Sequence, residues 1–133
     1  MPTLFIGGPP RCGGTLLNSI LCSDKTSNPL LRETHYFREL VQLYMRSKGT
    51  YSSLEENHYF PDEASLRVFS TRLAQQFIDL ISNRYHDAET IVLKSISLTL
   101  MFSAVHELLP TARYLIVVRD PRDTITSQLE VGL

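Results

Sequence analysis

Short apolar runs alternate along the chain with longer segments that mix apolar and polar residues, and this pattern predicts the order of the secondary structure. Three runs are nearly continuous in apolar and β-branched residues: 3–6, 90–93 and 114–118. Such runs are typical of parallel strands that are covered on both faces, whereas half-exposed strands alternate apolar with polar residues. We therefore predict three buried parallel strands.

The segments between these runs show helical spacing. We predict helices over residues 15–21, 36–46, 63–85, 98–109 and 124–131, and a surface loop over 49–61. The clearest is 63–85, because its apolar residues recur every three or four positions and Asp62 stands before it as an N-cap. The apolar stripe of this helix is Leu66, Phe69, Leu73, Phe77, Leu80 and Ile81, and that of 36–46 is Phe37, Leu40, Val41 and Tyr44.

Alternating strands and helices predict an α/β fold, in which right-handed crossovers join the strands of a parallel sheet and helices flank it. Ligands of such sheets bind outside the carboxyl ends of the strands. Here those ends are followed by residues 7–14, 94–97 and 119–123, and each segment carries groups that suit an anion. We therefore expect one anion-binding site built from all three.

Composition narrows the classes of protein. With 133 residues, of which 43% are hydrophobic, the chain suits a single domain over 1–133. A formal net charge of −1 argues against a nucleic-acid-binding surface, and no run approaches the roughly 20 apolar residues of a membrane span. Two cysteines are too few for a disulfide framework or a zinc site, so we expect no metal and a reducing, cytoplasmic location.

The turn after the first strand reads GGPPRCGGTLL from Gly7 onward. Its glycines let the backbone approach an anion, and the helix that starts near Thr15 directs free N–H groups and its positive dipole end toward the same place. Arg11 adds a planar cation. Nucleotide triphosphatases carry a Lys followed by Ser or Thr in this loop, and that pair is absent here. A glycine-rich connection that binds nothing is the alternative reading.

The turn after the third strand adds a second set of polar groups. Arg119 ends the run, and Ser127 follows eight residues later on the next predicted helix, so the two can converge on a phosphate. A surface pair between Arg119 and Asp120 is the alternative.

Two further segments carry candidate chemistry. Glu33 and His35 alternate in an extended approach to a helix, where both can face one cleft as general base and helper. Lys94 ends a buried strand, where its charge must reach an anion or water. Solvated side chains are the alternative for all three residues.

Together these segments resemble the sulfotransferases that use 3′-phosphoadenylyl sulfate. GGPPRCGGTLL resembles their 5′-phosphosulfate loop, RDPRDTITS their 3′-phosphate motif, and ETHYF the Glu-x-His-aromatic-Phe segment of the heparan-type branch. LPTARYLIVVRDPRD is similar to bacterial members. The order of the matches follows the family, and they extend from Phe5 to Ser127.

The resemblance implies a P-loop-like α/β/α sandwich that transfers a sulfuryl group to an acceptor hydroxyl or amine, with carbohydrate among the acceptor classes. It implies that Glu33 is the base, assisted by His35, and that Arg11 and Lys94 stabilise the charge on the transferring group. Residues implied to bind the nucleotide are Arg11, Cys12, Gly13, Gly14, Thr15, Leu16, Arg119 and Ser127. The resemblance also implies that arginine and lysine stabilise the transfer without a metal, because a sulfuryl group carries less charge than a phosphoryl group.

Departures from the family pattern keep alternatives open. Cys12 stands where serine is usual, and Gly14 where a threonine often donates to the phosphate. Family members also continue well beyond the last helix, so we expect the domain to be incomplete at its carboxyl-terminal end, with an exposed sheet edge through which copies can associate. A non-catalytic nucleotide-binding remnant is the main alternative, and a P-loop nucleotide kinase is the weaker one.

Overall fold

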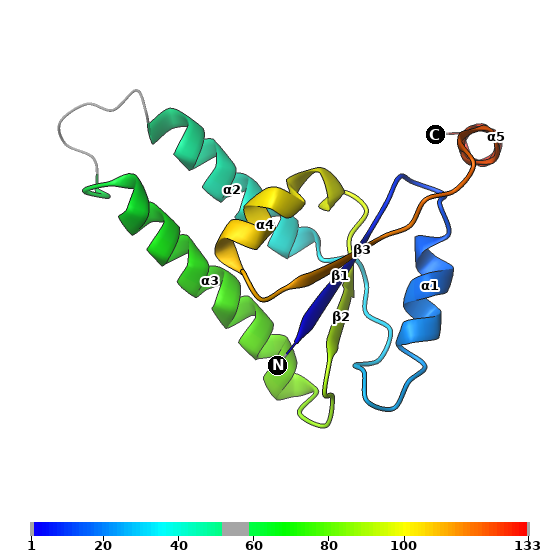
Figure 1. Ribbon diagram of the computed structural model, residues 1–133, viewed down its shortest axis with the longest axis horizontal. Helices are drawn as coiled ribbons and strands as arrows, with labels where there is room; N and C mark the ends of the chain where they lie inside the picture. Colours follow the sequence, from blue (N-terminus) through cyan, green and yellow to red (C-terminus); the bar gives the residue numbers. More distant parts are fainter. Residues whose placement is uncertain (1, 52–58, 133) are drawn as a thin grey trace.

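The computed structural model describes residues 2–51 and 59–132 as an α/β fold (Figure 1). Its elements follow one another as strands and helices in nearly the predicted order. They are β1 (Thr3–Gly7), α1 (Gly14–Leu21), α2 (His35–Tyr51), α3 (Glu63–Arg84), β2 (Ile91–Lys94), η1 (Thr99–Met101), α4 (Phe102–Leu108), β3 (Arg113–Ile116) and α5 (Pro121–Glu130).

The described strands form one parallel sheet in the order β2-β1-β3. Phe5 of β1 pairs with Leu93 on one side and Tyr114 on the other, and Ile6 pairs with Lys94 and Leu115. Because β1 is central and all pairings are parallel, the carboxyl ends of the three strands meet at one edge.

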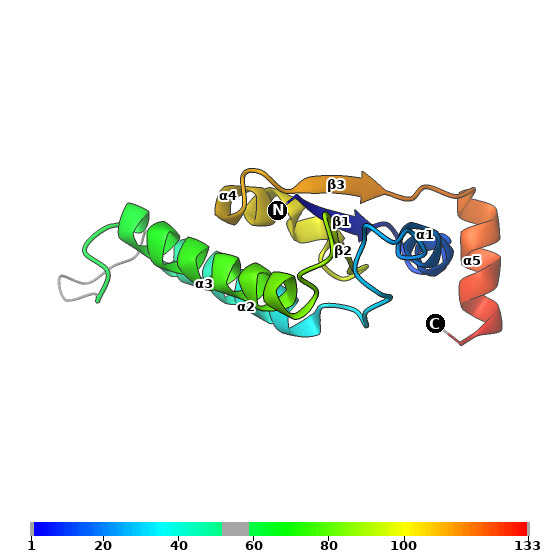
Figure 2. The same ribbon diagram turned by 90° about the horizontal axis from the view of Figure 1, so that it is seen from below.

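Helices cover both faces of the sheet, which confirms the predicted sandwich. Helix α1 lies on one side, while α2, α3 and α4 lie on the other, with α2 and α3 side by side and antiparallel (Figures 1 and 2). None of the helices in the described part of the chain is both long and apolar enough to span a bilayer.

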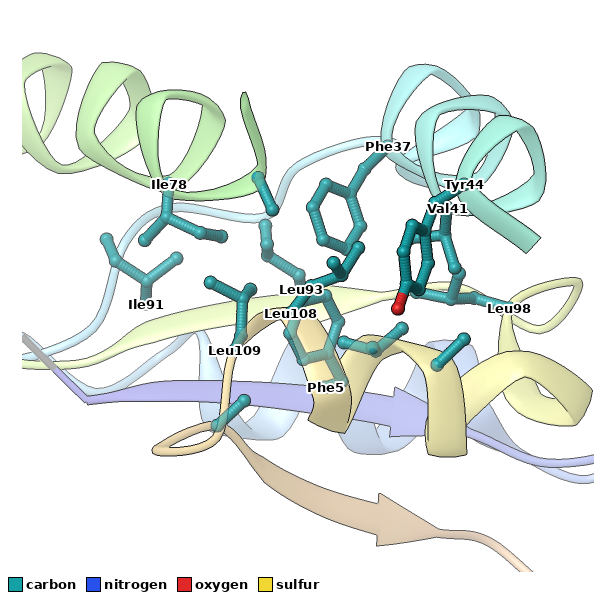
Figure 3. Packing of buried hydrophobic residues seen from close by; sticks show 14 of the residues in the cluster. Phe5, Phe37, Val41, Tyr44, Ile78, Ile91, Leu93, Leu98, Leu108 and Leu109 are labelled. Atoms are coloured by element: carbon teal, nitrogen blue, oxygen red, sulfur yellow. The ribbon is translucent and has the colours of Figure 1, made fainter. Parts of the chain in front are cut away.

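The main core lies between the sheet and α2, α3 and α4 (Figure 3). Phe5, at its centre, is fully buried and stacks on Phe37 of α2 and Tyr114 of β3, with ring centroids 5.5 and 6.1 Å apart. Burial raises the pKa of the Tyr114 hydroxyl to about 12, so this ring stays neutral inside the core. Aromatic stacking thus holds the central strand to both α2 and its neighbour β3.

The predicted buried stripe is confirmed in α2 but only partly in α3. In α2, Phe37, Val41 and Tyr44 are buried, and the predicted stripe is confirmed. The stripe predicted for α3 is wrong in part, because Phe69 and Leu80 are exposed. The residues of α3 that are buried are Leu66, Ser70, Ala74 and Ile78, while Phe77 and Ile81 of the predicted stripe pack against the core partly buried. Small Ser70 and Ala74 let α3 approach closely, and an apolar pattern alone does not reveal such positions. Asp62 caps α3 as predicted, accepting from the Ser65 N–H at 2.6 Å.

The third strand also differs from its prediction. β3 is one of the two edge strands of the described sheet; its Leu115 and Ile116 are 36 and 55% exposed, and Val118, just beyond it, is 84% exposed. Continuous apolar residues predicted burial on both faces, yet α1 packs mainly on β1 and β2, and Leu115 and Ile116, which point to opposite faces, both stay exposed. In the described residues no strand pairs with the outer side of β3, and association of copies through that edge stays a prediction.

Several element bounds shift. The helix predicted over 98–109 divides into η1 and α4, and the last helix begins early, with Asp120 as its N-cap and Pro121 in its first turn. Pro121 supplies a helical φ and needs no amide partner there. Residues 49–51, predicted as loop, end α2, and residues 52–58 of that predicted loop lie outside the described part of the chain.

A buried asparagine covers the outer edge of β2. Asn28 is fully buried; its Oδ1 accepts from the Val92 N–H at 2.6 Å, and its Nδ2 donates to the Val92 carbonyl at 3.1 Å. The side chain therefore replaces a neighbouring strand at this point, and the bridge between Ser27 and Thr90 continues the cover.

We predict that Asn28→Ala lowers the free energy of unfolding by about 2 kcal/mol, because it leaves a buried N–H and a buried C=O without partners. Urea unfolding followed by circular dichroism measures the loss. Asn83→Ala, at an exposed position of α3, is the matched control and should change little. Equal losses in the two variants would contradict the assigned role of Asn28.

Candidate functional site

The carboxyl ends of the three strands open into a cleft of about 1050 Å³. Every residue that the sequence predicted for the site lines this cleft, from segments as far apart as the turn after β1 and helix α5. The predicted residues are Arg11, Cys12, Gly13, Gly14, Thr15, Leu16, Glu33, His35, Lys94, Arg119 and Ser127. The structure thus brings together the full predicted set; the role of each member stays a prediction.

The turn between β1 and α1 has the backbone of an anion-binding loop. Gly13 precedes α1 in the left-handed region with φ 99°, and Arg11 adopts φ 64°, which is uncommon for a residue with a side chain. The first amides of α1 have no partner in the helix, so together with its dipole they offer a site for negative charge. Gly14 and Thr15, which begin α1, line the cleft at this point.

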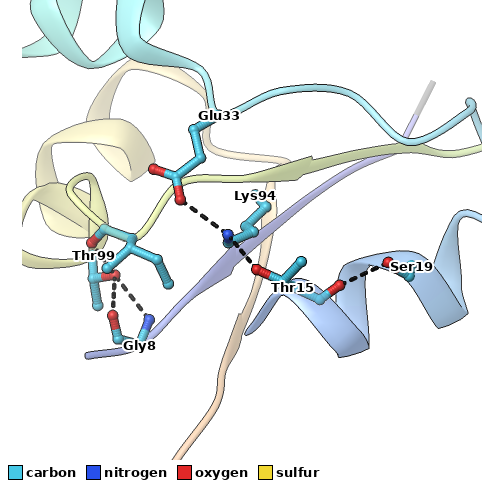
Figure 4. Close-up of polar contacts among 7 residues, drawn as sticks. Gly8, Thr15, Ser19, Glu33, Lys94 and Thr99 are labelled. Atoms are coloured by element: carbon cyan, nitrogen blue, oxygen red, sulfur yellow. Dashed lines mark hydrogen bonds and ion pairs between the residues drawn. The ribbon is translucent and has the colours of Figure 1, made fainter. Parts of the chain in front are cut away.

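Lys94 joins two parts of the site (Figure 4). Its Nζ lies 3.0 Å from Glu33 Oε1 and donates to Thr15 Oγ1 at 2.9 Å. Lys94 shares a face of the sheet with Ile6, the face that α1 covers, and its side chain is only 14% exposed. The lysine therefore reaches partners within the cleft, and its role there stays a prediction.

Arg11, Arg119 and Ser127 form a second network that lines the same cleft. Arg11 Nε donates to Ser127 Oγ at 3.0 Å, and Arg119 Nη1 donates to the Arg11 carbonyl at 3.2 Å. Arg119 follows β3, and Ser127 lies within α5. The turn after β1 is thus held against the turn after β3 and the helix that follows it.

The surface pair considered for Arg119 is formed by a different residue. Asp120 pairs with Arg122 at 2.9 Å, and hydrogen bonds from Arg122 hold the pKa of this carboxyl below its ordinary value. Arg119 therefore keeps its guanidinium at the cleft.

The remaining predicted residues lie at different depths. Cys12 is buried, and its Sγ packs near Gly8 and Gly14, so it fills space under the turn as a small residue. Leu16 and His35 are exposed at the rim. The His35 N–H donates to the Glu33 carbonyl at 2.9 Å, a tight turn that leads the chain from Glu33 into α2.

Sequence reasoning missed part of the lining. Thr99 of η1 lines the cleft and hydrogen bonds to the turn after β1, and Ile96 and Leu100 add apolar surface beside it. The sequence offered one clue to these residues: they follow Lys94, a predicted site residue at the end of β2. Their spacing matches no motif that pointed to an anion.

Metal ligands do not gather in the described ranges 2–51 and 59–132, where no group of three or more His, Cys, Asp and Glu side chains could hold an ion. The polar groups that do converge are cations, hydroxyls and a single carboxylate.

Comparison with known proteins decides the family. A model of the sulfotransferase family matches residues 2–131, nearly the whole chain. This chain belongs to the sulfotransferase family. The match covers all three strand ends and the cleft between them, so the site belongs to the part of the chain that the family shares.

Two curated members of this sulfotransferase family are similar along the same range. A protein-tyrosine sulfotransferase of Drosophila melanogaster is 32% identical over 130 residues, which is 96% of this chain and 25% of the relative. Protein-tyrosine sulfotransferase A of Caenorhabditis elegans is 30% identical over 131 residues, 95% of this chain and 32% of the relative. The chain thus spans about a quarter to a third of the length of the curated relatives that it matches.

Glycine is required at one position of the turn much more strictly than at another. A Cβ at Gly8, where φ is 143°, would lie 2.6 Å from the Val117 carbonyl oxygen, whereas at Gly13, with φ 99°, it would meet no described atom within 4 Å. We predict that Gly8→Ala lowers the free energy of unfolding by about 3 kcal/mol and Gly13→Ala by about 1 kcal/mol. Urea unfolding measures both, and losses of equal size would contradict the clash at Gly8.

Proposed function

We propose that this chain carries the donor-binding part of a sulfotransferase, which moves a sulfuryl group from 3′-phosphoadenylyl sulfate to an acceptor hydroxyl. One observation carries the proposal: a single cleft joins the Lys94, Glu33 and Thr15 contacts to the Arg11, Arg119 and Ser127 contacts. Family membership supplies the reaction class, and the arrangement of donors and acceptors supplies the roles.

The two networks suit the two charged ends of the donor. The turn around Gly13 and the first amides of α1 suit its 5′-phosphosulfate end. Arg119 and Ser127 suit the 3′-phosphate. Ser127 Oγ accepts from Arg11, which leaves its own proton to donate to an anion. Each end thus has a cation and a hydroxyl: Lys94 and Thr15 at the 5′ end, and Arg119 and Ser127 at the 3′ end.

Lys94 suits stabilisation of the leaving group. An ammonium has three N–H donors, and Glu33 and Thr15 take two of them, so the third can point at the oxygen between sulfur and phosphorus. Thr15 accepts from Lys94, so its proton is left for the 5′-phosphate. Cations fixed in advance cost no reorganisation when charge develops on that phosphate.

Glu33 suits the role of base. Its carboxylate is partly exposed to the cleft and is held by Lys94, which also faces the transferring group. As the acceptor oxygen forms its bond to sulfur, the sulfur–oxygen bond to the 5′-phosphate breaks and its electron pair stays on the phosphate. The acceptor proton passes to Glu33. His35, at the rim two residues away, is proposed to orient the acceptor.

For the acceptor, the named relatives favour a protein tyrosine, because both are protein-tyrosine sulfotransferases. The apolar side chains of Ile96 and Leu100 at the cleft suit a phenol ring better than a polyhydroxylated sugar. We therefore propose a peptide tyrosine hydroxyl as the acceptor, with carbohydrate as the competing class.

Two further expectations remain proposals. A second copy of the chain can pair along the free edge of β3, where Leu115 and Ile116 are exposed; sedimentation velocity tests this association. The cytoplasmic location rests on the cysteine count alone, and fractionation of cells that express the chain tests it.

We predict that Arg119→Ala weakens the binding of adenosine 3′,5′-bisphosphate by roughly 10- to 100-fold, because charge-assisted hydrogen bonds to the 3′-phosphate are lost. Isothermal titration calorimetry measures the change. Arg122→Ala is the matched control, since Arg122 pairs with Asp120 and should leave affinity unchanged. Tighter binding of ATP that requires magnesium would instead support a kinase.

We predict that Glu33→Gln lowers turnover by about 100-fold or more and leaves the affinity for the bisphosphate nearly intact, because the amide cannot take the acceptor proton while its carbonyl oxygen can still accept from Lys94. Transfer of labelled sulfate to tyrosine peptides and to oligosaccharides measures turnover. Glu39→Gln, on the exposed surface of α2, is the control. Unchanged turnover in Glu33→Gln would refute the base. Nucleotide binding by the wild type without transfer to any acceptor would favour the non-catalytic remnant.

A further inference from the structure

Thr99 lies where the turn after β2 meets the turn after β1 (Figure 4). Its Oγ1 accepts from the Gly8 N–H at 2.9 Å and donates to the Ile96 carbonyl at 2.7 Å. The Gly8 carbonyl is farther from the same oxygen, at 3.4 Å. A hydroxyl has one proton, so the shorter contact to Ile96 uses it.

The contact between these turns is tight as well as polar. A Cβ on Gly7 would lie 2.6 Å from Thr99 Oγ1 and 2.7 Å from the ring of Phe102. The backbone of the β1 turn is therefore pressed directly against η1 and the start of α4. The hydroxyl lies at the point of closest approach.

We propose that Thr99 is a positioning residue for the anion-binding turn, an inference that rests on the proposed function. Its hydroxyl fixes the turn where the chain leaves β1, by taking the N–H of Gly8. With its proton already donated to Ile96, it has no donor left for a ligand, so it acts through the turn and not on the nucleotide.

The same hydroxyl links the turn to Lys94. Ile96, whose carbonyl accepts from Thr99, stands two residues after the lysine that donates to Thr15. The turn is thus held at its start by Thr99 and at its end by Lys94; Lys94 is the last residue of β2, and Thr99 begins η1 five residues later. Holding both ends keeps the amides around Gly13 aimed at the 5′ end of the nucleotide.

The test compares two ligands that differ only at the 5′ end. By calorimetry, Thr99→Val should weaken adenosine 3′,5′-bisphosphate by about tenfold and leave adenosine 3′-monophosphate unchanged, since one hydrogen bond that orders the 5′ site is lost. Thr99→Ser should restore the affinity. Thr26→Val is the matched control, because the Thr26 hydroxyl bonds to Asp24 within its own turn.

Equal weakening of both ligands would mean a general structural role, and no weakening of either would mean no role; each result overturns the proposal. Amide hydrogen exchange supplies a readout that needs no nucleotide. The Gly8 amide should exchange slowly in the wild type and in Thr99→Ser, and at least about tenfold faster in Thr99→Val. If the wild type binds no bisphosphate, the proposed function fails, and unchanged Gly8 exchange would separately overturn the anchoring by Thr99.

Discussion

Parallel pairing of β1 with a strand on each side is the constraint on which the rest of the structure depends. Because all three strands point the same way, the turns after β1, β2 and β3 meet at one edge. The aromatic stack around Phe5 holds this arrangement from the α2 face, and Asn28 covers the outer edge of β2. This alignment brings the residues at the three strand ends to the cleft, and the segment from Glu33 to the start of α2 adds Glu33 and His35.

The cleft is organised by hydrogen bonds between turns. Lys94 ties the end of β2 to α1, Arg119 ties the turn after β3 to Arg11, and Thr99 ties η1 to Gly8. In each case a side chain from one strand end bonds to the backbone or hydroxyl of another. Cations and hydroxyls held in this way would need little reorganisation to meet an anion, which is what the proposed transfer requires.

The fold class was predictable because it follows from the order of apolar runs and helical stripes, and the membership of the cleft because its groups stand near strand ends and in the segments that resemble the family motifs. The sequence could not predict which strand would lie at an edge, since β1 and β3 are similar apolar runs and their burial depends on what covers them. It also misplaced the inner face of α3, where Ser70 and Ala74 face the core because they are small. Thr99 was missed since its role arises from a contact 91 residues away.

The contact from Arg11 to Ser127 joins residues that are 116 positions apart. Closing such a long stretch of chain costs conformational entropy before any contact repays it, and parallel sheets form slowly for the same reason. We infer that the cleft is among the last parts of the molecule to form. A nascent chain or a partly folded intermediate that has not yet brought α5 to the turn after β1 would lack this cleft, so the cleft itself reports completion of the fold.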